Sequence, residues 1–116
     1  MTVRTIIRMG NPILRQTADP YPKELIGSTE FESLVDDMRE TLHASGGIGL
    51  AAPQISIGYR LAVIEIENTM TRYGEIEPVP FEIYINPRIT VISPEAAGYW
   101  EGCLSVPGIT GYVERP

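Results

Sequence analysis

The chain contains one cysteine, Cys103, and one histidine, His43, which are the side chains best suited to nucleophilic or metal chemistry. A thiolate is a soft ligand for zinc or ferrous iron, although a lone cysteine often serves only as a small buried apolar residue. Gly102 precedes Cys103, and a glycine lets a ligand or another backbone approach closely. Glu101 lies two residues before Cys103, on the same face of an extended strand. This stretch is therefore the first candidate site.

A second segment rich in small residues lies upstream, and it reads Gly47-Ile48-Gly49-Leu50-Ala51-Ala52-Pro53-Gln54. A glutamine that follows a proline is often only a solvated loop residue. Here the small neighbours of Gln54 would allow its carboxamide to be packed tightly into a site. Gln54 is therefore the second candidate for a site residue.

One helix is predicted over residues 29–44. Thr29 and Glu32 have the spacing of a capping box. Gly46 and Gly47 end the helix, because glycine readily adopts the left-handed conformation at a helix end. The apolar residues recur at helical spacing on one face, and they are Phe31, Leu34, Val35, Met38 and Leu42. We expect this face to pack on a core.

The other apolar segments alternate with polar residues or are rich in β-branched residues, which predicts strands. They cover residues 60–66, 81–86, 88–92, 99–106 and 109–114. Residues 68–80 are polar and are expected to form a loop, residues 107–108 join the last two strands, and Asn11 with Pro12 begins a helix of about one turn. One helix and several strands predict an α+β fold with antiparallel strands.

Composition narrows the class of protein. Apolar residues make up 43% of the 116 residues and charged residues 21%, which suits a soluble globular domain or a piece of one. The net charge of −6 argues against nucleic acid as a partner. One cysteine cannot form an internal disulfide, and we find neither a signal peptide nor the roughly 20 apolar residues of a membrane span. The expected location is the cytoplasm.

The two segments resemble two of the three signature motifs of the peptide deformylases, Gly-Ile-Gly-Leu-Ala-Ala-Pro-Gln at 47–54 and Glu-Gly-Cys-Leu-Ser at 101–105. These metal-dependent hydrolases remove the formyl group from the N-terminal methionine of new bacterial proteins. The resemblance extends over residues 8–116. It implies a deformylase-like α+β fold and a substrate that is an N-formyl-methionyl peptide, such as a nascent chain at the ribosome.

The resemblance also implies roles for single residues. Cys103 matches one of three protein ligands of the catalytic divalent metal, which the family implies to be Fe²⁺, although Zn, Ni or Co could occupy the same ligands. Gln54 and the backbone N–H of Leu104 match the groups that hold the oxyanion. Ile48 and Gly49 match positions whose backbone pairs with the substrate peptide as an added strand.

Four further residues are expected to bind substrate on the same basis. Tyr99 would help to line the pocket for the methionine side chain, although an aromatic residue in a strand is usually part of a core. Glu101 and Gly102 flank the metal ligand. Arg115 matches an arginine near the downstream end of the substrate, although any surface arginine would look the same.

The third motif of the family, His-Glu-x-x-His on a central helix, is absent from the printed sequence. In the family it supplies two histidine ligands and the general base. We therefore expect residues 1–116 to form a single domain that corresponds to the N-terminal two-thirds of a deformylase catalytic domain, with an incomplete ligand set. His43 matches no ligand position, and we expect it to be structural, near the C-terminal end of its helix.

Two alternatives to a metal hydrolase remain open on the sequence. The first is a catalytically inactive homologue that retains a peptide-binding groove. The second is a cysteine hydrolase that uses Cys103 with His43, which requires the two side chains to lie within hydrogen-bond reach. The sequence after Cys103 is strand-like, so it offers no helix N-terminus to lower the pKa of the thiol.

Overall fold

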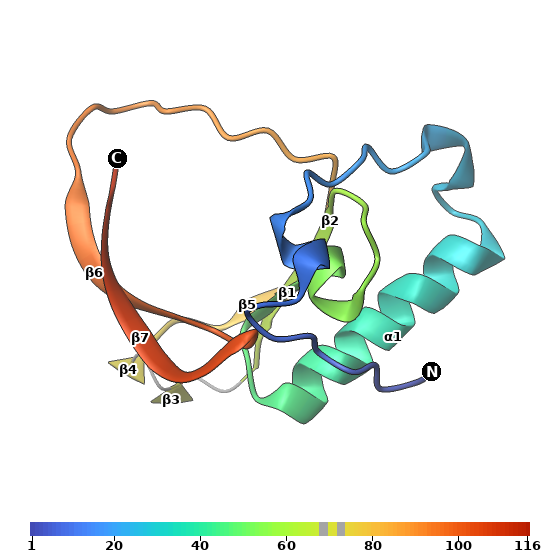
Figure 1. Ribbon diagram of the computed structural model, residues 1–116, viewed down its shortest axis with the longest axis horizontal. Helices are drawn as coiled ribbons and strands as arrows, with labels where there is room; N and C mark the ends of the chain where they lie inside the picture. The colour runs from blue at the N-terminus through green and yellow to red at the C-terminus, as the bar shows by residue number, and fades with distance from the viewer. Residues whose placement is uncertain (68–69, 72–73) are drawn as a thin grey trace.

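The computed structural model of the protein describes residues 1–67, 70–71 and 74–116. A single long helix lies at one end, a three-stranded antiparallel sheet lies in the middle, and a long two-stranded hairpin stands at the other end (Figure 1). This arrangement confirms the α+β class with antiparallel strands. No helix in the described ranges combines the length and apolar content that crossing a bilayer requires.

Helix α1 spans Thr29–Ser45. The hydroxyl of Ser28 accepts a hydrogen bond from the backbone N–H of Phe31 at 3.1 Å, so the predicted capping box at Thr29 and Glu32 was wrong by one residue. Serine is among the best N-cap residues because its short side chain reaches the free N–H groups of the first turn. Gly46 ends the helix in the left-handed conformation, with φ of 70°, as predicted.

The central sheet packs on the apolar face of α1. It consists of β1 (Gly49–Ala51), β2 (Leu61–Ile66) and β5 (Val79–Ile85), in the order β1-β2-β5. Every second residue of β2 is buried, so one face of this strand meets the helix. The buried apolar core contains Tyr21, Phe31, Val35, Met38, Leu42, Leu50, Ala52, Ile55, Leu61 and Val63.

Strand β1 was missed by the sequence analysis, because a run of small residues carries no strand periodicity. It becomes a strand by pairing with β2, where Gly49 lies opposite Ile64. The chain then turns into the short 3₁₀ helix η3 (Ala52–Ile55), which carries Gln54. Two other 3₁₀ turns precede α1: η1 (Pro12–Arg15), which confirms the turn expected after Asn11, and η2 (Lys23–Leu25).

The hairpin consists of β6 (Ala97–Cys103) and β7 (Val106–Arg115). The chain reverses at residues 104–105, so the prediction that residues 107–108 join the strands was wrong. Cys103 pairs with Val106, whereas Gly102 pairs with Thr110, and the extra residues on β7 therefore form a bulge. Gly108 has φ of 77° within this bulge, a conformation that glycine adopts without strain.

Two predictions between β2 and β6 were also wrong in part. Residues 88–92 form no strand, because they arch away from the sheet (Figure 1) and no described strand pairs with them. The expected loop over 68–80 contains the two-residue strands β3 (Met70–Thr71) and β4 (Gly74–Glu75), which pair with each other, and the start of β5. Residues 68–69 and 72–73 of that prediction lie outside the described residues.

Candidate functional site

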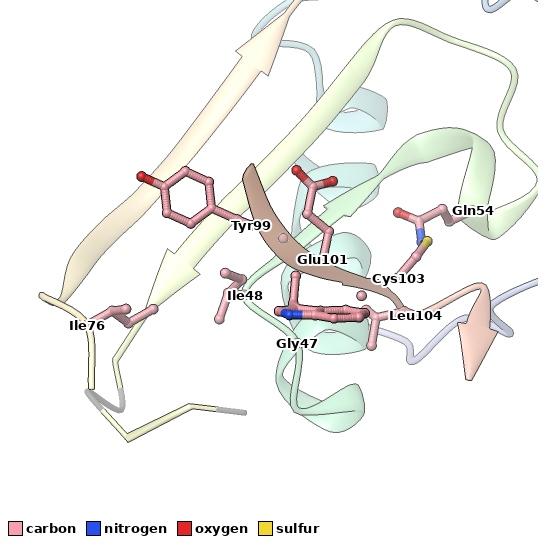
Figure 2. A pocket seen from close by; sticks show the side chains of 11 residues that line it. Gly47, Ile48, Gln54, Ile76, Tyr99, Glu101, Cys103 and Leu104 are labelled. Atoms are coloured by element: carbon pink, nitrogen blue, oxygen red, sulfur yellow. The ribbon is translucent and has the colours of Figure 1, made fainter. Parts of the chain in front are cut away.

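A pocket of about 680 Å³ lies between the central sheet and the hairpin. Its walls come from the two segments that the sequence analysis singled out, together with Tyr99 and Trp100 of β6 and with Ile76, which follows β4 (Figure 2). The residues that line it are Gly47, Ile48, Gly49, Gln54, Ile76, Tyr99, Trp100, Glu101, Gly102, Cys103 and Leu104. The fold therefore brings together every predicted site residue except Arg115.

The two walls of the pocket are strands that belong to different sheets. β1 is an edge strand of the three-stranded sheet, and β6 belongs to the separate hairpin. An edge strand presents backbone donors and acceptors that an extended peptide can pair with. One wall of the pocket is thus an edge strand, and the other belongs to the hairpin.

The carboxamide of Gln54 occupies one end of this pocket. Its Oε1 accepts a hydrogen bond from the backbone N–H of Ala51 at 2.9 Å. Its Nε2 lies 3.1 Å from the hydroxyl of Ser105 and 3.7 Å from the sulfur of Cys103. Gln54 and Cys103 are 49 residues apart in the sequence, and Figure 2 shows their side chains pointing toward one another.

Leu104 fixes the backbone next to Cys103. Its side chain is partly buried against the core and lies over Gly47, where an added Cβ would come within 2.8 Å of Leu104 Cδ1. Because Gly47 has no side chain, the hairpin turn can lie directly on the start of the first motif. This contact holds the backbone N–H of Leu104 in place relative to residues 47–54.

The N-terminal segment, residues 7–9, forms hydrogen bonds with both motifs of the site. The backbone N–H of Ile7 donates to the carbonyl oxygen of Gln54, and that of Met9 donates to the carbonyl oxygen of Ser105, each at 2.8 Å. A smaller cavity of about 300 Å³ lies on this side and also reaches Gln54 and Cys103. The positions of both motifs therefore depend on a stretch of chain that carries no recognisable motif.

Arg115 does not line the pocket. Its guanidinium donates two hydrogen bonds to the carboxylate of Glu101, at 2.6 and 2.7 Å. This pairing lowers the pKa of Glu101 and keeps the carboxylate ionised. The arginine thus contacts the pocket wall through Glu101, across the hairpin from β7 to β6.

Four residues of the site did not appear among the predicted positions. Gly47 and Ser105 belong to the two motifs, so their positions in the sequence could have pointed to them. Trp100 follows Tyr99 directly and packs edge-on against Tyr112, with ring centroids 5.6 Å apart. Ile76 gave no signal, because it falls in a polar segment whose path is decided only by the pairing of the surrounding strands.

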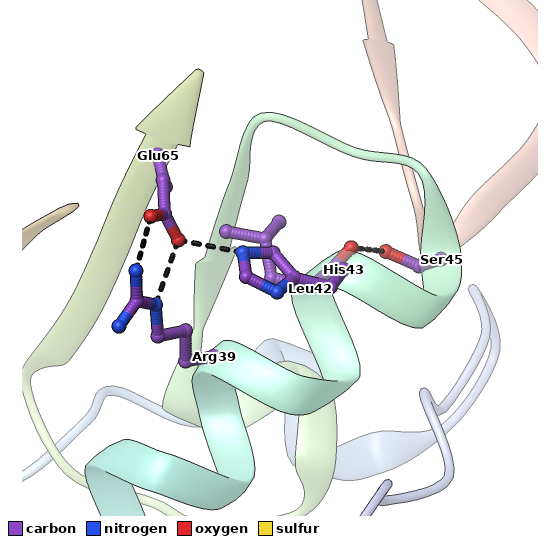
Figure 3. A network of polar contacts seen from close by, with 5 residues as sticks. All are labelled: Arg39, Leu42, His43, Ser45 and Glu65. Atoms are coloured by element: carbon purple, nitrogen blue, oxygen red, sulfur yellow. Dashed lines mark hydrogen bonds and ion pairs between the residues drawn. The ribbon is translucent and has the colours of Figure 1, made fainter. Parts of the chain in front are cut away.

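His43 belongs to a different cluster on the other side of the sheet. Its Nε2 lies 2.6 Å from Oε2 of Glu65, and Arg39 donates to both oxygens of the same carboxylate (Figure 3). The hydrogen bonds from Arg39 lower the pKa of Glu65 to about 2. No hydrogen bond joins His43 to Cys103 within the described ranges, so the geometry gives no support to a cysteine hydrolase that uses this pair.

Cys103 is the one predicted metal ligand among the described residues that line the pocket. The thiol is exposed at the pocket, and a sulfur in such a position can act as a soft ligand. Among the residues that the structure describes, three potential ligands converge only at His43, Glu65 and Glu67, whose ligand atoms lie within 4.8 Å of one another. Both oxygens of Glu65 are already bound by Arg39 there.

Comparison with known proteins gives a consistent result. The family model for polypeptide deformylase matches residues 3–116. A peptide deformylase of Leptospira biflexa is 49% identical over 116 residues, which cover all of this chain and 65% of that protein. Peptide deformylase 2 of Pseudomonas syringae is 48% identical, over 97% of this chain and 63% of that protein. The chain thus spans less than two-thirds of the length of these curated relatives.

A solved structure agrees with the sequence comparisons. The class I type b peptide deformylase of Acinetobacter baumannii with bound Met-Ala-Ser has a TM-score of 0.86 at 31% identity, over 99% of this chain and 72% of that one. The matched residues include both motifs that form the pocket. On this evidence the chain belongs to the polypeptide deformylase family.

Proposed function

We propose that the protein, as its gene encodes it, hydrolyses the formyl amide of N-formyl-methionyl peptides, with nascent chains at the ribosome in the cytoplasm as its natural substrates. The observation that carries this proposal is the carboxamide of Gln54, whose Nε2 lies 3.7 Å from the sulfur of Cys103 in a pocket of peptide size. The membership of the deformylase family supports the same reaction.

The proposed catalytic donors are the Nε2 of Gln54 and the backbone N–H of Leu104. Amide hydrolysis passes through a tetrahedral oxyanion, and each fixed donor in such a site stabilises it by about 2.7–4 kcal/mol. Both groups are held by other parts of the fold: Gln54 by Ala51 and Ser105, and Leu104 by its contact with Gly47. Little reorganisation would therefore be needed when charge develops on the substrate.

The proposed peptide site lies between β1 and β6. The backbone of Ile48 and Gly49 would pair with the substrate as an added strand. The opposite wall would be formed by Tyr99, Glu101 and Gly102. The Met-Ala-Ser bound to the deformylase of Acinetobacter baumannii supports a peptide ligand for a protein of this fold.

Arg115 would contribute to substrate binding through Glu101. The two hydrogen bonds between them hold the carboxylate at the pocket wall in its ionised form. An ionised carboxylate accepts hydrogen bonds only. We propose that Glu101 accepts from donors of the peptide, and that Arg115 keeps it in position.

The proposed cofactor is one divalent metal ion, Fe²⁺ by analogy with the family, with Zn, Ni or Co as substitutes. The thiolate of Cys103 would hold it as one ligand. When bound, such an ion supplies an activated water and polarises the carbonyl oxygen of the formyl group. Among the described residues, no group of three potential metal ligands includes Cys103.

The test is formate release from formyl-Met-Ala-Ser by the gene-encoded protein, supplied under reducing conditions with each of the four metals. We expect the wild-type protein to release formate and Cys103→Ala to release none above background. Unformylated Met-Ala-Ser should inhibit, because it occupies the same groove. Thr41→Val serves as a control, since Thr41 is a buried hydroxyl residue on α1, and it should retain activity in its folded fraction.

The competing function makes a different prediction. A peptide-binding homologue without hydrolysis would bind Met-Ala-Ser and formyl-Met-Ala-Ser with similar affinity. Such binding with no formate release under any of the four metals would overturn the hydrolase proposal and favour the inactive homologue.

A further inference from the structure

We infer that Ser105 is a positioning residue that fixes the carboxamide of Gln54, so that one Nε2 hydrogen is directed toward the substrate carbonyl. This inference rests on the proposed function, because it concerns the residue that would hold the oxyanion. It adds Ser105 to a site in which the thiol, the glutamine and the leucine backbone were the predicted groups.

The first step is the orientation of the Gln54 carboxamide. Its oxygen and nitrogen have opposite hydrogen-bonding capacities, since Oε1 only accepts and Nε2 only donates. The backbone N–H of Ala51 lies 2.9 Å from Oε1, and a backbone N–H can bind only an acceptor. The oxygen is therefore directed to the backbone of β1, and the NH₂ group must face the hairpin turn.

The second step is the partner of that NH₂ group. The hydroxyl oxygen of Ser105 lies 3.1 Å from Nε2, and Ser105 is only 3% exposed. Its position is fixed through the main chain, because its carbonyl oxygen accepts a hydrogen bond from Met9 at 2.8 Å. The same N-terminal segment binds the carbonyl oxygen of Gln54 through Ile7. The N-terminal segment thus fixes the distance between the hydroxyl of Ser105 and the carboxamide of Gln54.

The third step concerns the remaining hydrogen of Nε2. One hydrogen is directed to Ser105, and the other faces the sulfur of Cys103 at 3.7 Å. Sulfur is a weak acceptor, so this contact is readily exchanged for a carbonyl oxygen. The terminal torsion of a glutamine side chain has a broad energy profile. Without Ser105, the carboxamide would rotate and lose the fixed orientation on which oxyanion stabilisation depends.

The activity test is a double-mutant cycle in the gene-encoded protein with formyl-Met-Ala-Ser as substrate. Ser105→Ala should lower kcat by about 5- to 10-fold, which corresponds to the loss of one neutral hydrogen bond. KM should change by no more than about twofold, because Ser105 touches no substrate in the proposed complex. In the Gln54→Ala background, the same substitution should change kcat by less than about twofold, because a pair that acts as a unit is not additive.

Thr41→Val is the matched control for the loss of a buried hydroxyl. Thr41 is 1% exposed, and its hydroxyl donates to the carbonyl oxygen of Asp37 and accepts from the backbone N–H of Arg4. This variant should leave kcat unchanged, in the wild-type and in the Gln54→Ala background alike. Equal effects of Ser105→Ala in both backgrounds would overturn the inference, because they would indicate a structural role unrelated to Gln54.

A second measurement needs neither metal nor turnover. In the substrate-free wild-type protein, the two Nε2 protons of Gln54 should give distinct NMR signals, with nuclear Overhauser contacts to the β-protons of Ser105. Absence of these contacts overturns the inference, even if Ser105→Ala fails to fold. In a folded Ser105→Ala variant the signals should move toward those of a solvated glutamine, and unchanged signals would overturn it.

The two measurements separate this inference from the proposed function. If the Gln54 signals move in Ser105→Ala and formate release falls, both stand. If the signals move and formate release is unaffected, Ser105 positions Gln54 as inferred, whereas the proposed catalytic role of Gln54 is overturned.

Discussion

Two polar clusters lie on different sides of the central sheet, and their chemistry differs. In the first, which we call the ion-pair network, Arg39 and His43 on α1 bind the carboxylate of Glu65 on β2 (Figure 3). In the second, the pocket cluster, Gln54 lies beside Cys103 and Ser105 (Figure 2). The network is built on the ion pair between Arg39 and Glu65, whereas the side chains of Gln54 and Ser105 in the pocket cluster carry no charge.

The difference lies in what each cluster leaves available to a ligand. Both oxygens of Glu65 are bound and its side chain is 4% exposed, so the network holds the helix on the sheet. The thiol of Cys103 is exposed, and its contact with Nε2 of Gln54 is a long one. In the ion-pair network both carboxylate oxygens already have partners, so the network stabilises the fold. In the pocket cluster the amide of Gln54 and the thiol of Cys103 face the pocket, so they can contact a ligand.

The largest effect that we predict separates these roles at Gln54. Gln54→Ala should lower kcat for formyl-Met-Ala-Ser by about 100- to 1000-fold, as the loss of an oxyanion donor does elsewhere. The free energy of unfolding, measured with a denaturant, should fall by only about 1–2 kcal/mol, because two neutral hydrogen bonds are lost, one to Ala51 and one to Ser105. A large loss of stability with a small loss of kcat would contradict this prediction, because it would show that Gln54 serves stability and not catalysis.

Glu65→Ala is the corresponding change in the network. The free energy of unfolding should fall by about 2–3 kcal/mol, since hydrogen bonds to a charged group are lost. Arg39 and His43 are nearly half exposed, so water can solvate the two side chains that lose their partner, and the cost stays below that of a fully buried pair. Denaturant unfolding measures this change.

The control for Glu65 is its neighbour Glu67, which is exposed. Glu67→Ala should change the free energy of unfolding by less than about 0.5 kcal/mol. The kcat of the folded fraction of Glu65→Ala should stay near the wild-type value. A loss of kcat as large as that of Gln54→Ala would show that the network acts on the site.

Acid should remove part of the same stabilisation. Hydrogen bonds from Arg39 lower the folded-state pKa of Glu65 from the usual 4.5 to about 2, so the unfolded chain binds the proton more tightly. This contribution is fully present above about pH 4.5 and is lost as the pH falls toward 2. Denaturant unfolding at a series of pH values should show the loss, and Glu65→Gln should lack this part of the pH dependence.

A second carboxylate adds to the acid sensitivity and must be separated from Glu65. Burial opposes the ionisation of Asp37, but hydrogen bonds from Arg4 and Thr2 outweigh it and lower its pKa. Its contribution is lost in the same direction as the pH falls. Glu65→Gln should therefore retain a residual pH dependence, and an unchanged dependence would contradict the assignment to Glu65.

The smallest predicted effect concerns Gly47, at the border of the pocket. Gly47→Ala places a Cβ within 2.8 Å of Leu104 Cδ1, and the overpacking should cost about 1 kcal/mol. Because Leu104 would shift with its backbone, kcat should also fall several-fold. Gly58→Ala is the matched control, since a Cβ there would meet nothing within 4 Å. Equal kinetics for the two variants would contradict a role for Gly47 in positioning Leu104.

Much of the fold could be predicted from local patterns. The apolar stripe of α1 and the run over β2 were recognisable because helical and strand periodicities differ. The predictions failed where pairing rather than pattern decides the structure. The short strand β1 forms only because Gly49 meets Ile64, and residues 88–92 have a strand-like sequence but no described partner.

The sequence by itself determined the family and the chemical groups of the site, because the two motifs are specific in residue type and spacing. Only the tertiary structure decided which of these groups meet. It brought Gln54 to Cys103, directed Arg115 to Glu101 instead of the pocket, and placed Ser105 beside the carboxamide. The physical reason is that these contacts join segments far apart in the chain, and no local periodicity encodes a hydrogen bond between them.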